Sequence, residues 1–187
     1  LEAEKAGYAV IDAPTIIATH LTELIRRNAS KILSRQSVSA IIEEIKKTNP
    51  VVVDEVTTGD HRFSYGEIEA VLKNLLEEQV SIRNMVVILE TLGDYGKLTR
   101  DPWTLTEKVR EALGAQICQQ YADENKVLHV LNLSQSLAQK ILDHRADMPG
   151  KGPIVAFDPV DARNYISTMS NAVAAVRERN YLPIILC

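Results

Sequence analysis

Apolar residues recur every three or four positions through the first hundred residues of the chain, which predicts a series of amphipathic helices. The first helix is expected to begin at Thr15, which follows a proline and is a suitable N-cap. A second, shorter helix is expected from Ser37, its predicted N-cap, to Asn49, because the next residue is a proline and disfavours helical geometry before it. Residues 51–63 are interpreted as a connecting loop.

Two further helices are predicted to form a hairpin. Their apolar stripes cover residues 68–76 and 82–92, and the second helix is expected to begin at Ser81. An aspartate and a proline at positions 101 and 102 can serve as N-cap and first helical residue, and they open a helix that is expected to reach about Tyr121. Residues 15 to about 100 should therefore form an all-helical unit that buries these stripes against one another.

The pattern changes after Asp123, where short apolar runs alternate with helix-like segments. Strands are expected within KVLHVLNL, PIVAFD and LPIILC, with a turn at PGKGP, residues 149–153. A long helix separates the last two strands, so we predict a βαβ unit in which these two strands are adjacent and parallel. The sheet is expected to continue in residues beyond position 187.

These patterns together predict an α+β fold with several subdomains, in which an all-helical subdomain is followed by a small α/β subdomain with a partly parallel sheet. Residues 1–14 are interpreted as the end of an upstream subdomain, with a strand at YAVI. Residues 15–100 are assigned to the helical subdomain and residues 101–187 to the α/β subdomain. The chain begins in mid-pattern without a methionine, so we expect it to be part of a longer protein.

Composition narrows the class of protein without identifying it. The chain is 45% hydrophobic and 25% charged with a net charge of −4, which is typical of a globular protein and does not indicate a nucleic-acid surface. Its apolar runs are far shorter than the roughly 20 residues that a membrane helix needs. Cys118 and Cys187 have no CxxC spacing, so we expect neither a disulfide framework nor a zinc site. A reducing compartment is the expected location.

Two patterns superficially suggest a ligand site. His20 and Glu23 lie three positions apart on a predicted helix, but a zinc site needs three or four ligands and there is no HExxH motif, so an exposed or capping pair is favoured. The PGKGP run lacks the spacing and the Ser or Thr of a phosphate-binding loop and precedes a strand rather than a helix. We therefore predict no metal and no cofactor.

Asp158 is the strongest candidate for catalysis, because it ends a strand and opens a helix, where α/β enzymes often place catalytic groups. The proline that follows it repeats the capping pattern of position 101, so an N-cap is favoured over a catalytic role. His129 and His144 lack a nucleophile partner nearby in the sequence. No catalytic residues are assigned, and the residues alone leave the function open.

Three segments resemble the flagellar and type III secretion export-gate family, the FHIPEP family. GYAVIDAPTIIATHLTELI (residues 7–25) is similar to that family's GY-x-VVD-PPT-VIATHL segment. The family's helical hairpin is similar to residues 68–96, IEAVLKNLLEEQVSIRNMVVILETLGDYG. The helix that follows the hairpin in the family is similar to residues 98–117, LTRDPWTLTEKVREALGAQI. The chain departs from the usual pattern at Ala13, Ser34 and Tyr65, and the hairpin favours the flagellar branch over the virulence branch.

The resemblance implies a non-enzymatic docking platform. Family members have a membrane part and a cytoplasmic part of several subdomains, which assembles into a nonameric ring beneath the inner membrane. That ring receives export substrates with their chaperones, alongside other components of the export apparatus. This chain would be the later portion of the cytoplasmic part, on the cytoplasmic side of the membrane.

The resemblance also implies a partner-binding site at Ile11, Ile16 and Thr19, which match positions that line a shallow chaperone-binding cleft in the family. Branched apolar side chains offer contact area to an amphipathic helix, and a threonine adds a directional hydrogen bond. Packing of the two isoleucines in a protein interior is the alternative. The alternative functions are a virulence-type export-gate homologue, or a small α/β enzyme or regulatory domain with Asp158 near its site.

Overall fold

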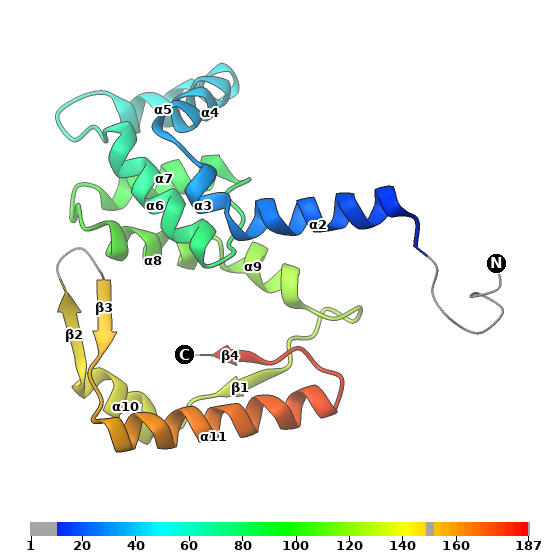
Figure 1. Ribbon diagram of the computed structural model, residues 1–187. Coiled ribbons are helices and arrows are strands. Elements are labelled where there is room, and N and C mark those ends of the chain that lie inside the picture. The colour runs from blue at the N-terminus through cyan, green and yellow to red at the C-terminus, as the bar shows by residue number, and fades with distance from the viewer. Residues whose placement is uncertain (1–10, 149–151, 187) are drawn as a thin grey trace. The chain divides into compact units, whose positions relative to one another are not determined.

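The computed structural model describes residues 11–148 and 152–186 of the chain (Figure 1). Residues 8–10 of the predicted YAVI strand and residues 149–151 of the predicted turn lie outside the described residues. The described chain falls into two compact units, one ending at Leu113 and the other beginning at Gly114.

The first unit consists of helices. They are α2 (Ala13–Arg27), α3 (Ala29–Ile32), α4 (Arg35–Thr48), α5 (Pro50–Thr57), α6 (Tyr65–Glu77), α7 (Met85–Tyr95) and α8 (Pro102–Ala112). Helix α8 packs against α6 and α7, so it belongs to this helical unit. The division between the units therefore lies at Leu113–Gly114, whereas the sequence pattern suggests a division near residue 100.

The core of the helical unit is formed by α4 to α8. Most side chains of the predicted stripes of the hairpin and of the following helix are buried there, as is one face of the helix predicted around residue 40. The fully buried side chains include Val38, Ile42, Ile68, Val71, Leu72, Leu75, Ile88, Leu89, Leu92, Leu105 and Val109. Burial of one such side chain contributes about 1.5–3 kcal/mol, so this core is the main source of stability of the unit.

Residues 50–57 form helix α5, so the prediction of a loop over 51–63 is wrong for its first half. Pro50 lies at the first helical position, where its missing N–H group costs no hydrogen bond. Val53 and Val56 lie three positions apart on this helix and are both buried. A valine-rich segment has low intrinsic helix propensity, and packing against α4 and α7 overrides that preference.

The helix starts also differ from prediction at three places. The residue at the N-cap of the first helix is Asp12 rather than Thr15. The helix can begin before Pro14 because a proline is tolerated in the first helical turn. Ser34 rather than Ser37 caps α4, and its hydroxyl accepts a hydrogen bond from the Ser37 N–H at 3.2 Å. Helix α7 begins at Met85, four residues after the predicted start.

Polar groups fix the junction between α6 and the segment before it. Ser64 and Glu67 form a reciprocal capping box at the start of α6. The Arg100 guanidinium lies 4.0 Å from the centre of the Phe63 ring and 3.6 Å from a Glu67 carboxylate oxygen, and it donates to the carbonyl of His61. Residues 61–63 are thereby held against the segment that leads into α8.

The second unit contains α9 (Gly114–Tyr121), β1 (Val130–Asn132), α10 (Gln135–Asp143), β2 (Arg145–Met148), β3 (Gly152–Val155), α11 (Pro159–Glu178) and β4 (Ile184–Leu186). The predicted single helix from 101 to 121 is therefore divided at Leu113–Gly114. Strand β1 pairs with β4 in parallel, and β2 pairs with β3 in antiparallel fashion. The α+β class with parallel and antiparallel strands is confirmed, and most of the chain is helical.

The predicted pairing of the last two strands is wrong. Strand β4 pairs with β1, and β3 is instead joined to β2, which comes just before it in the chain. A short hairpin connection closes a small loop and needs no helical crossover, so it favours this local antiparallel pair.

The α/β unit buries little apolar surface among the residues that the structure describes. From Gly114 onward, no described hydrophobic side chain is buried, and several large ones are exposed. Within the described ranges, no helix is both long enough and apolar enough to cross a membrane.

Replacing Gly96 by alanine should destabilise the helical unit by about 1–3 kcal/mol. A Cβ atom at this position would lie 2.3 Å from Cε2 of Phe63 and 2.6 Å from the Leu92 carbonyl oxygen, so the packed ring and the end of α7 would have to move. Chemical denaturation of both proteins measures the loss. Gly114→Ala is the matched control, because nothing lies within 4 Å of its Cβ position, and equal stability of the two variants would contradict the packing seen here.

Acid should destabilise the helical unit as the pH falls through the carboxylate range. The Thr104 hydroxyl and backbone N–H donate to Asp101 and lower its pKa below the ordinary value. A lowered pKa in the folded state means stability that is complete above pH ~4 and is lost on acidification below it. Denaturation curves between pH 7 and pH 2 should show a shallower decline for Asp101→Asn than for the unaltered chain, and identical slopes would count against this contribution.

Candidate functional site

The three residues assigned to partner binding lie at the start of helix α2. Ile11 precedes the helix, while Ile16 and Thr19 lie in its first two turns. Ile11 and Ile16 are 56% and 54% exposed, and Thr19 is exposed as well. Residues three apart in a helix lie on the same side, so the helix brings Ile16 and Thr19 together.

The Thr19 hydroxyl is oriented by its own helix. It donates a hydrogen bond to the Thr15 carbonyl at 2.8 Å, and Thr22 makes the same bond to the Ala18 carbonyl one turn further on. These bonds engage the hydroxyl protons and leave oxygen lone pairs directed to solvent. Thr19 can therefore accept a hydrogen bond from a bound partner without breaking its own.

A second apolar surface occupies a different side of α2. Ile17, Leu21, Leu24 and Ile25 follow the i, i+4, i+7, i+8 spacing and form one exposed stripe. Successive residues of a helix are rotated by about 100°, so this stripe and the Ile16 side do not coincide. No described residue of α2 is buried, so the prediction that this stripe packs inside the helical unit is wrong. The packing of α2 is instead against the short helix α3.

His20 and Glu23 do not form a shared ligand site. The Glu23 carboxylate accepts a hydrogen bond from the Arg27 Nε at 2.7 Å, and this bond lowers the pKa of Glu23. Such an i,i+4 pair stabilises a helix slightly. Among the described residues, no group of three or more His, Cys, Asp or Glu side chains is placed to bind a metal.

Asp158 is the N-cap of α11, as the sequence predicts. Its Oδ1 accepts hydrogen bonds from the backbone N–H groups of Val160 and Asp161 at 2.9 and 3.1 Å. These two bonds, from Asp161 and then Val160, lower the pKa of the Asp158 carboxyl. The geometry accounts for this carboxylate as a helix cap, and its oxygen is already engaged.

The two histidines of the α/β unit take part in structural contacts. His129 stacks on Tyr181 with ring centres 3.9 Å apart, and its Nε2 lies 3.3 Å from Asp123 Oδ2. Asp123 also accepts from the backbone N–H groups of Val127 and Asn125, and this lowers its pKa. The imidazole of His144 lies against the Phe157 ring and its Nδ1 is 2.8 Å from the Lys140 carbonyl oxygen.

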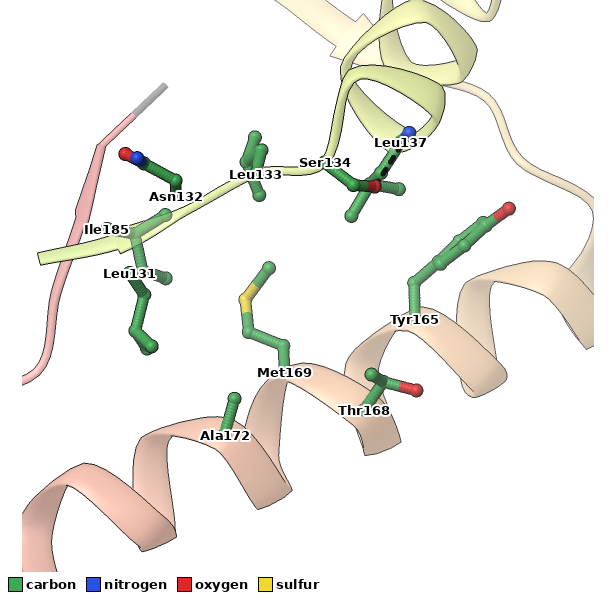
Figure 2. A pocket seen from close by; sticks show the side chains of 10 residues that line it. All are labelled: Leu131, Asn132, Leu133, Ser134, Leu137, Tyr165, Thr168, Met169, Ala172 and Ile185. Atoms are coloured by element: carbon green, nitrogen blue, oxygen red, sulfur yellow. Dashed lines mark hydrogen bonds between the residues drawn. The ribbon is translucent and has the colours of Figure 1, made fainter.

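An open apolar cavity of about 240 Å³ lies between β1, β4, α10 and α11 of the α/β unit, and Figure 2 shows the side chains that line it. The Met169 side chain points into it from α11, between Leu131 and Tyr165. Hydroxyl groups on its wall are engaged, because Ser134 accepts from the Leu137 N–H and Thr168 donates to the Asn164 carbonyl. The sequence pattern does not predict this cavity, because its wall combines residues 131–137, 165–172 and 185, which share no motif.

Comparison with models of protein families identifies the family to which this chain belongs. The model of the FHIPEP family matches the chain over residues 1–187. The chain belongs to the FHIPEP family. It shares 42% identity over 184 residues with the flagellar biosynthesis protein FlhA of Borreliella burgdorferi, covering 98% of this chain and 26% of that relative. The chain thus spans about a quarter of the length of this relative.

Solved structures show the same fold. The Chlamydia pneumoniae CdsV protein, in a complex with CdsO, matches with a TM-score of 0.78 and 25% identity over 90% of this chain and 48% of its own. A nonameric EPEC SctV-C matches with a TM-score of 0.74 and 23% identity over 83% of this chain and 46% of its own. The resemblance to the export-gate family is confirmed, and the flagellar biosynthesis protein FlhA is among the relatives that the chain matches. The family comprises export-gate components and is not a known enzyme family.

Replacement of Asp158 by alanine should lower the stability of the α/β unit by about 1 kcal/mol, while Asp158→Asn should recover most of the loss. Alanine cannot accept from the first two N–H groups of α11, whereas asparagine caps a helix nearly as well as aspartate. Thermal or chemical denaturation of the three proteins measures the series. An asparagine variant as unstable as the alanine variant would show that the negative charge, rather than capping, is what this position requires.

Proposed function

We propose that the chain is a docking platform of a flagellar-type protein export gate, which binds chaperone–substrate complexes through the Ile16–Thr19 side of helix α2. Membership of the FHIPEP family, together with the exposure of Ile16 and Thr19 side by side on α2, carries the proposal. The two side chains belong to a segment that resembles the family's cleft-lining sequence. Ile11 is exposed just before the helix begins, and we include it in the proposed docking surface.

The chemistry of this surface suits an amphipathic helix. A branched apolar group at Ile16 provides area for an apolar side chain of the partner, and the accepting oxygen of Thr19 provides direction. Helix α2 is stiffened by the Glu23–Arg27 ion pair one turn further along. A preformed helix loses less conformational entropy on binding than a loop would.

In the full-length protein, this chain would form part of a homo-oligomeric ring on the cytoplasmic side of the inner membrane. The nonameric state of SctV-C and the CdsV–CdsO complex support such a ring and contacts with other export-apparatus components. The 42% identity with a flagellar relative, against 25% with CdsV, favours the flagellar branch over a virulence-type homologue. An enzyme with Asp158 at its site is disfavoured, because that carboxylate caps α11.

In the full-length protein, Thr19→Asp should weaken binding of an export chaperone–substrate complex by roughly 30-fold or more, and Ile16→Ala by roughly fivefold. The carboxylate places an uncompensated charge at the contact, and the alanine removes apolar contact area. Isothermal titration calorimetry with purified proteins gives both affinities.

Leu21→Asp is the matched control for the charge, since Leu21 is also exposed but lies on the apolar stripe of α2, away from the Ile16–Thr19 side. Its binding should stay within about twofold of the unaltered protein. Circular dichroism of each variant checks that α2 and the helical unit remain folded. Unchanged affinity in a folded Thr19→Asp protein would remove this surface from the docking site.

A further inference from the structure

We draw no further inference here: the strongest candidate, the apolar cavity between strands β1 and β4 and helices α10 and α11 of the α/β unit, carries no proposal because nothing in the described part of the chain shows what covers it.

Discussion

Burial of one face of helix α6 is the interaction on which the helical unit depends. Ile68, Val71, Leu72 and Leu75 are all fully buried, and helices α3, α4 and α8 pack around them. Each of these side chains contributes about 1.5–3 kcal/mol by leaving water, so removing any one of them affects every neighbouring helix. The capping box that begins at Ser64 sets where α6 starts, and therefore which residues face this core.

Helix α2 contrasts with this core because its residues remain accessible. Its apolar stripe and its Ile16–Thr19 side point in different directions, so the same helix offers two separate surfaces. Only one of these surfaces is used in the proposed docking function. A helix can serve as a docking element when its own hydrogen bonds are complete, and the threonine and ion-pair contacts along α2 meet that condition.

The sequence predicts those parts of the fold that depend on local chemistry. The capping carboxylates at Asp101 and Asp158 are N-caps as predicted, since a cap requires only the following turn. Two predictions were wrong: the partner of strand β4, and a loop where residues 50–57 form a helix. Both features depend on packing with residues far away in the chain. The proposed site was available only through family resemblance, since Ile16 and Thr19 carry no chemical motif of their own. The apolar cavity could not be predicted, because its wall exists only after folding.

Site-specific photo-crosslinking in cells tests the proposed docking surface most directly. A photoreactive residue would replace Thr19 in the full-length protein, with a second variant carrying it at Leu24 on the opposite apolar stripe. Docking through the Ile16–Thr19 side predicts crosslinks to an export chaperone from position 19 and few or none from position 24. Chaperone crosslinks from position 24 with none from position 19, in proteins that still support export, would contradict it.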